Sequence, residues 1–262
     1  PYYWKVKIDT TKGATNWSAP AFWTTGLFNE ADWQGQWIGL DRAAPGDSET
    51  QWSRLAARYL RKEFAVKKSV KRATVHIAGM GLYELFINGQ RIGDQVLAPA
   101  PTDYRKTILY NTYDVTSQLQ QENAIGVTLG NGRFYTMRQN YKPYKIPTFG
   151  YPKLRLNLIV EYADGSKETI ATNTSWKLTT EGPVRSNNEY DGEEYDARKE
   201  LGNWTQTGYD DTKWMPAERV SIPSGTLRAQ MMPGMKVTET LKPVSIQKMG
   251  DKYIMDTGQN LA

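Results

Sequence analysis

Apolar and polar residues alternate in short runs along most of this chain. In the run 74–78, Val75 and Ile77 are apolar while Thr74 and His76 are polar, which is the pattern of a strand with one buried face. We predict strands over residues 2–8, 22–25, 58–66, 74–78, 82–87, 108–113, 123–129, 152–162, 167–171, 176–178, 236–240, 244–248 and 253–256, and a further strand that begins at residue 96.

Turn-forming residues separate these runs at short intervals. Asn88 and Gly89 suit the positive φ angles of a tight hairpin. The triplet 130–132, Gly-Asn-Gly, allows a sharp bend and a close approach of backbone to a ligand. No long helical period lies between the turns. The sequence therefore predicts an all-β fold, an antiparallel β-sandwich, with any binding site in the loops at the strand ends.

The composition narrows the range of functions. The chain has 262 residues, with 16 Tyr and 9 Trp against 6 Phe. Tyr and Trp offer a flat apolar face with a polar edge, which suits a sugar ring, and they equally suit half-buried sheets. The net charge of +5 comes from interspersed charges, without a basic stripe that would indicate nucleic-acid binding. No apolar run approaches the roughly 18 residues of a membrane span.

Cysteine and histidine counts exclude several chemistries. There is no cysteine, so disulfides, thiolate zinc sites and cysteine nucleophiles are excluded. The one histidine, His76, would have to serve any Ser-His-Asp triad, and it cannot form a His-rich metal site alone. Because it is out of phase with Val75 and Ile77, we expect it at a surface or half-buried position.

The most polar stretch of the chain is 186–198, SNNEYDGEEYDAR. On an extended chain Asp191 and Glu193 project to one side, and Glu194 and Asp196 to the other. Inverting glycoside hydrolysis needs two carboxyl groups about 6.5–9.5 Å apart, and Asp191 and Glu193 share a face. The other interpretation, which we favour, is a domain-junction network of Asp191, Glu193, Asp196 and Arg198, in which Arg198 pairs with Asp196 or Glu194. The family resemblance set out next assigns no catalysis to this segment, so we predict no catalytic residue in this chain.

Eight segments together carry a family resemblance: DWQGQWIG, INGQRIGDQVLAPAPTDYRK, LYNTYDVT, VTLGNGRFY, EYADGS, YDGEEYDAR, GYDDTKW and YIMDTGQN. In this order they resemble the non-catalytic front half of bacterial α-L-rhamnosidases. The resemblance implies a galactose-binding-like jelly-roll sandwich over residues 31–228. It places the end of a fibronectin-III-like module at 1–30 and the start of a second β domain at 229–262. It also implies that terminal L-rhamnose is released, with inversion, in an (α/α) barrel that this chain lacks, so the chain alone is inactive.

The resemblance further implies a sugar site, because some relatives of this sandwich bind L-rhamnose through calcium. Calcium takes six to eight oxygen ligands, some of which vicinal hydroxyls can supply. The predicted substrate-binding residues are Asp103, Tyr104, Asn131, Arg133 and Tyr135, with Asp103 and Asn131 as calcium ligands. The sequence departs from the family after the 130–132 turn, where Arg-Phe-Tyr replaces the common Trp-Tyr. The loop 136–149 also lacks Asp and Glu, which leaves one carboxylate and a weak calcium site.

The remaining expectations concern partners and location. The resemblance implies a rhamnose-containing glycan or glycoside and the other domains of the same polypeptide as partners, with no nucleic acid and no membrane. It implies a secreted or periplasmic location, and a chain that begins in mid-strand as part of a longer protein. The competing hypothesis is a purely structural scaffold, in which the TDY and GNG motifs only form turns and pack.

Overall fold

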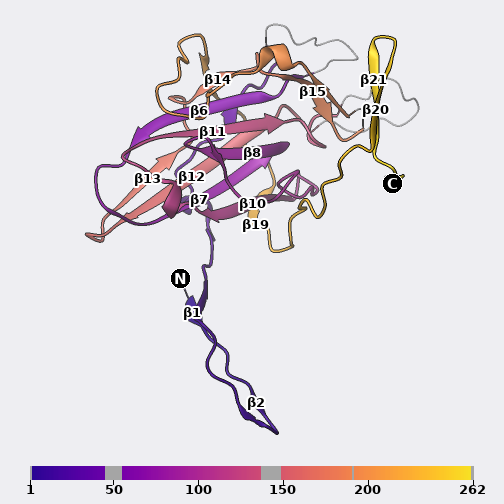
Figure 1. Ribbon diagram of the computed structural model, residues 1–262. Coiled ribbons are helices and arrows are strands. Elements are labelled where there is room, and N and C mark those ends of the chain that lie inside the picture. The colour runs from indigo at the N-terminus through magenta and orange to yellow at the C-terminus, as the bar shows by residue number, and fades with distance from the viewer. Residues whose placement is uncertain (1, 45–54, 137–148, 191, 261–262) are drawn as a thin grey trace.

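The alternating runs form two stacked β-sheets in the computed structural model, which describes residues 2–44, 55–136, 149–190 and 192–260 (Figure 1). The first sheet has the strand order β18-β5-β12-β7-β10-β19, with β13 beside β12. The second has the order β17-β14-β6-β11-β8-β9. Except for the parallel pair β10–β19, neighbouring strands in both sheets run antiparallel. The predicted all-β antiparallel sandwich is confirmed.

The first sheet comprises β5 (Ile38–Gly39), β7 (Val70–Met80), β10 (Thr107–Asp114), β12 (Lys153–Tyr162), β13 (Lys167–Ala171), β18 (Glu218–Arg219) and β19 (Thr226–Ala229). The second comprises β6 (Arg58–Ala65), β8 (Leu82–Ile87), β9 (Gln90–Arg91), β11 (Glu122–Gly130), β14 (Lys177–Thr179) and β17 (Met215–Pro216). Separate two-stranded ribbons are β1 (Tyr2–Trp4) with β4 (Ala21–Trp23), β2 (Asp9–Thr10) with β3 (Gly13–Ala14), β15 (Val184–Asn188) with β16 (Gly192–Tyr195), and β20 (Ser245–Met249) with β21 (Lys252–Asp256). Short 3₁₀ turns are η1 (Glu30–Asp32), η2 (Thr116–Gln118) and η3 (Ala197–Lys199).

The core lies between the two sheets and is filled by alternate residues of the long strands. Val75 and Ile77 of β7 meet Ile125 and Val127 of β11, and all four are fully buried. Other members of this cluster are Leu85, Ile87, Leu129, Leu154, Leu156, Leu158, Val160 and Trp176. Burial of such side chains contributes about 1.5–3 kcal/mol each relative to exposure, so the alternation that predicted the strands also supplies most of their stabilisation.

Several local predictions are confirmed and others are wrong. Asn88 (φ 51°) and Gly89 (φ 81°) form the predicted hairpin turn between β8 and β9. No strand begins at residue 96. Instead the N–H of Val96 donates to the carbonyl of Met235 (2.8 Å), and the predicted strand 236–240 is reduced to a single bridge between Gln95 and Lys236. These two segments pair with each other in place of a longer sheet.

The prediction for His76 is also wrong, because this side chain is only 5% exposed. Trp33 and Tyr110 pack edge-on against its ring, and its Nδ1 lies 3.0 Å from the Thr112 hydroxyl. Burial, helped by the charge of Arg72, lowers the pKa of His76 to about 4. The strand pattern could not reveal this, because a segment distant in sequence covers the outer face of the first sheet.

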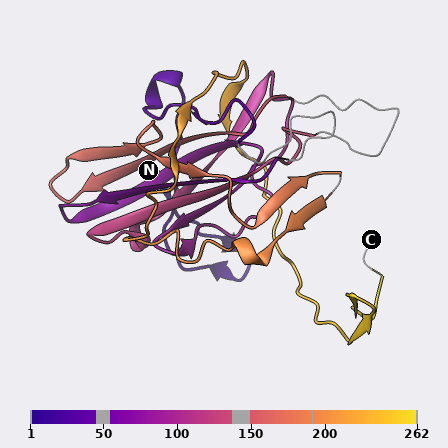
Figure 2. The ribbon, with the colours of Figure 1, turned by 90° about the horizontal axis from the view of Figure 1, so that it is seen from above.

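Both ends of the described chain extend away from the sandwich (Figures 1 and 2). They are anchored at β10. The Tyr110 hydroxyl accepts from the Leu27 N–H (2.8 Å) and donates to the Leu27 carbonyl (2.9 Å). β19 pairs with the same strand, and the N–H of Gln230 donates to the Tyr110 carbonyl (2.9 Å). The division into domains at 1–30, 31–228 and 229–262 stays a prediction.

Candidate functional site

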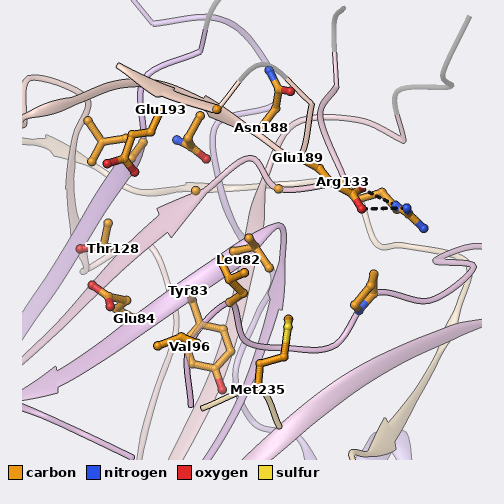
Figure 3. A pocket seen from close by; sticks show the side chains of 18 of the residues that line it. Leu82, Tyr83, Glu84, Val96, Thr128, Arg133, Asn188, Glu189, Glu193 and Met235 are labelled. Carbon is orange, nitrogen blue, oxygen red and sulfur yellow. Dashed lines mark hydrogen bonds and ion pairs between the residues drawn. The ribbon is translucent and has the colours of Figure 1, made fainter. Parts of the chain in front are cut away.

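A cleft of about 720 Å³ lies over the outer face of the second sheet, where β8 begins and β11 ends (Figure 3). Its floor is formed by Leu82, Glu84, Thr128 and Gly130. These residues alternate with the core residues of the same strands, so they point away from the first sheet. The cleft therefore follows from strand alternation, at a place where none of the described segments covers the outer face.

One wall of the cleft is polar and comes from the β15–β16 hairpin. Asn187, Asn188, Glu189, Glu193 and Tyr195 all line it. Asn187 fixes the hairpin to the sheet, because its Oδ1 accepts from the Asn131 N–H (2.7 Å).

A glycine makes this close approach of the hairpin to the sheet feasible. A Cβ at Gly130 would lie 2.7 Å from the Asn187 Oδ1, so the hairpin could not sit there over a larger residue.

The opposite wall is apolar and is formed by Val96, Leu97, Pro101 and Met235. Leu97 has φ 53°, in the left-handed region that non-glycine residues seldom adopt. Leu97 and Met235 are 55% and 51% exposed. Figure 3 places Val96 and Met235 across the cleft from Asn188 and Glu193.

Three glutamates line the cleft, and two of them pair with arginine. The Arg133 guanidinium donates to both carboxylate oxygens of Glu189, at 2.6 and 2.8 Å. Glu84 accepts from Arg91 Nε at 3.1 Å. Within the part of the chain that the structure describes, no basic side chain pairs with Glu193, so its carboxylate is available to accept hydrogen bonds from a ligand.

The five predicted sugar-binding residues divide between the cleft and its surroundings. Tyr104 and Arg133 line it. Tyr104 packs edge-on against Phe134 and Phe149, and burial raises its pKa to about 12. The role of these residues in sugar binding stays a prediction.

The other predicted residues lie outside the lining of the cleft. Asn131 is buried, and its Nδ2 donates to the Leu55 carbonyl (2.7 Å), while its Oδ1 has no hydrogen-bond partner among the described residues. Tyr135 is stacked on Tyr151 with ring centroids 5.5 Å apart. Asn131 thus supports the hairpin from below, next to the two glycines that do line the cleft.

The fifth predicted residue, Asp103, is also a predicted calcium ligand, together with Asn131. Its carboxylate accepts from Arg105 Nε (2.9 Å) and Nη2 (3.2 Å), and this hydrogen bonding lowers its pKa. In residues 2–44, 55–136, 149–190 and 192–260 no group of three or more Asp, Glu or His side chains is arranged to hold a metal ion. The described side chains do not fit calcium here unless Arg105 releases the carboxylate, and calcium binding stays a prediction.

The predicted domain-junction residues also divide. Glu193 lines the cleft, and Asp191 lies outside the described residues. Asp196 accepts from the N–H, Nε and Nη2 of Arg198, which lowers the pKa of Asp196 to about 2. The predicted pairing of Arg198 with Asp196 is confirmed, and it caps the short turn η3.

Several lining residues were missed by sequence reasoning. The run Asn187-Asn188-Glu189 lies in the polar stretch 186–198, and its two adjacent amides are the signal in the sequence that indicates a polar wall. Leu82 and Val96 gave no signal, because they read as ordinary strand residues, and Met235 gave none, because it stands outside every predicted strand and motif. Separately, no helix among the described residues has the length and apolar character of a membrane span.

Comparisons relate the chain to known proteins. A family model described as "Alpha-L-rhamnosidase N-terminal domain" matches residues 68–239. An α-L-rhamnosidase of Formosa agariphila is 37% identical over 282 residues, which cover 100% of this chain and 29% of that protein. This chain thus spans less than a third of that relative's length.

Solved structures match over nearly the whole chain. The structure of the native α-L-rhamnosidase from Aspergillus terreus matches with a TM-score of 0.85 and 36% identity, over 98% of this chain and 30% of that one. That of the Streptomyces avermitilis α-L-rhamnosidase complexed with L-rhamnose matches with a TM-score of 0.70 and 28% identity, over 98% and 26%.

Proposed function

Because this chain belongs to the family of α-L-rhamnosidase N-terminal domains, we propose that it is the accessory β-sandwich of an α-L-rhamnosidase and that its cleft binds a rhamnose-containing glycan or glycoside. In this proposal the parent enzyme releases terminal L-rhamnose with inversion, and the hydrolytic carboxylates lie in an (α/α) barrel elsewhere in the polypeptide. The proposal includes the secreted or periplasmic location that the family suggests, which fractionation of cells making the full-length protein checks.

The observation that carries the binding role is the composition of the cleft. Small-molecule sites are concave, about 300–1,000 Å³ in volume, and mostly apolar with a few polar groups that fix orientation. The cleft, at about 720 Å³, has this character, with Glu193, Asn188 and Tyr195 as the orienting groups. Hydroxyls of a sugar would donate to the Glu193 carboxylate, while C–H faces would contact apolar side chains.

The charge pairing in the cleft supports a role without hydrolysis. Inverting hydrolysis needs one carboxyl group that donates a proton and a second that activates water. Glu84 and Glu189 are each paired with an arginine, so both carboxylates are already engaged by a neighbouring side chain. Among the described residues that line the cleft, Glu193 then has no second unpaired carboxyl group beside it.

Isothermal titration of the 262-residue chain with L-rhamnose, with and without Ca²⁺, tests the proposal. We expect millimolar binding, weakened about fivefold by Glu193→Ala through loss of a charged acceptor. Glu194→Ala is the matched control, because Glu194 is the next residue of β16 and does not line the cleft. Hydrolysis of an aryl rhamnoside by this chain would contradict the non-catalytic role.

A scaffold role is the second candidate, and exposed apolar residues at both ends favour it. Tyr3, Phe28 and Val244 are large apolar side chains that the sandwich leaves exposed. Surfaces of this kind mark contacts with other protein. The partners would be the other domains of the same polypeptide. Absence of any heat with millimolar L-rhamnose, in either buffer, would favour this role over sugar binding.

A further inference from the structure

We infer that the ligand of this cleft carries a flat apolar ring beside its sugar, such as an aryl group, and that Leu97 and Met235 bind that ring. This inference rests on the proposed function, because it assigns the sugar to the polar wall and asks what the rest of the cleft accepts. A single sugar ring fills only part of about 720 Å³. The remaining space faces the apolar wall.

Leu97 lines the cleft with a backbone conformation that leucine disfavours. A leucine in the left-handed region is strained, since its Cβ crowds the following carbonyl. Most leucines also bury their side chain, whereas this one is 55% exposed. Strain of this kind gathers at ligand-binding positions, where the surrounding structure holds it in place.

Met235 reaches the cleft because a separate segment is fastened beside Leu97. The Val96 N–H donates to the Met235 carbonyl, and the Lys236 ammonium pairs with Asp94 at 2.6 Å. Gly234 permits the contact, since a Cβ there would lie 2.3 Å from the side chain of Gln95. The apolar wall is therefore assembled from two segments that are far apart in the sequence.

The chemistry of these two side chains points to a ring. Methionine adapts its shape and makes favourable sulfur contacts with aromatic rings. Leucine adds an apolar surface next to it. Across the cleft, Asn188 and Glu193 offer polar groups (Figure 3). A ligand that meets both walls has one end rich in hydroxyls and one flat apolar end.

The test compares 4-nitrophenyl α-L-rhamnoside with methyl α-L-rhamnoside by isothermal titration of the 262-residue chain. We expect the aryl glycoside to bind about tenfold more tightly, from burial of its ring. Leu97→Asn and Met235→Ala should each remove most of that advantage and weaken the binding of the methyl glycoside much less than that of the aryl glycoside. Asn tolerates a positive φ, so Leu97→Asn should fold at least as well as the parent chain.

Met232→Ala is the matched control, because Met232 is 57% exposed on the same segment and does not line the cleft. It should leave the affinity for both glycosides unchanged. Equal affinities for the aryl and methyl glycosides would overturn this inference and leave the proposed function standing. An aryl advantage that survives both Leu97→Asn and Met235→Ala would also overturn it. Failure of both glycosides to bind would overturn the proposed function as well.

Discussion

The outer faces of the two sheets both arise from strand alternation, but one is covered by another segment and the other is left partly open. On the first sheet, the segment around η1 covers the outward residues. Gly35 donates its N–H to Asn157 Oδ1 (2.8 Å), and Trp33 packs edge-on against Tyr110. On the second sheet, Trp204 and Trp214 cover part of the face and leave the cleft open beside them. Outward strand positions become core or binding surface according to which distant segment lies over them.

Removal of the cover from the first sheet should have the largest effect. Trp33→Ala should destabilise the chain by about 4 kcal/mol, as large-to-small changes of buried tryptophan do. It should also raise the pKa of His76 towards its ordinary value, because the ring would regain water. Urea unfolding and an NMR titration of His76 measure the two effects. A loss below about 1 kcal/mol would show that the covering segment is dispensable.

The pH dependence of stability should also show that the segment around η1 buries His76. His76 has a folded pKa of about 4, below its ordinary value of 6.5, so the folded state binds fewer protons between these values. The stability that depends on neutral His76 is fully present above pH 6.5. As pH falls towards 4, the free energy of unfolding should decrease by up to about 3 kcal/mol. Urea unfolding across this range measures it. In His76→Gln the fall should be smaller, and an unchanged fall would assign it to the carboxylates instead.

On the second sheet, Gly130→Ala should break the contact that seats the polar wall. The new methyl group would meet Asn187 Oδ1 and disturb its bond to the Asn131 N–H, with a loss of about 2 kcal/mol. Thermal unfolding measures the change in stability, and titration with L-rhamnose measures the change in affinity of the cleft. Unchanged stability together with unchanged binding would mean that the hairpin can shift at no cost.

The exposed pair between Arg133 and Glu189 should contribute least. Both side chains are well exposed, so a double-mutant cycle of Arg133→Met and Glu189→Gln should give a coupling of about 0.5 kcal/mol or less. Urea unfolding at low and high salt measures this coupling energy. A coupling above about 1.5 kcal/mol would make this pair comparable with buried Arg61, whose guanidinium pairs with Glu63 and Asp211.

The two faces also explain what the sequence could predict. Strand alternation is local, so it identified β8, β11 and β12 almost residue by residue, and the middle of β7. Burial of His76 and the pairing of Val96 with Met235 depend on segments far away in sequence, which no local pattern encodes. The family resemblance is confirmed by the match over residues 68–239.

The site was predictable only in part for the same reason. Tyr104 and Arg133 were predicted through the family resemblance and Glu193 as a domain-junction residue, and the fold brings all three to one cleft. The apolar wall was not, because Leu97 and Met235 have no unusual sequence context and become a surface only when their segments meet. Loops at strand ends thus indicate where a site lies more readily than what it accepts.

The anchoring of both arms at Tyr110 has a mechanical consequence. One side chain holds the N-terminal arm through Leu27, while the backbone of the same residue holds the C-terminal arm through Gln230. The two arms are therefore held by one strand, so a force on either arm reaches the other through β10. Tyr110→Phe would remove the two hydrogen bonds to Leu27 and keep the backbone hydrogen bond from Gln230. The N-terminal arm should then gain mobility while the C-terminal arm does not.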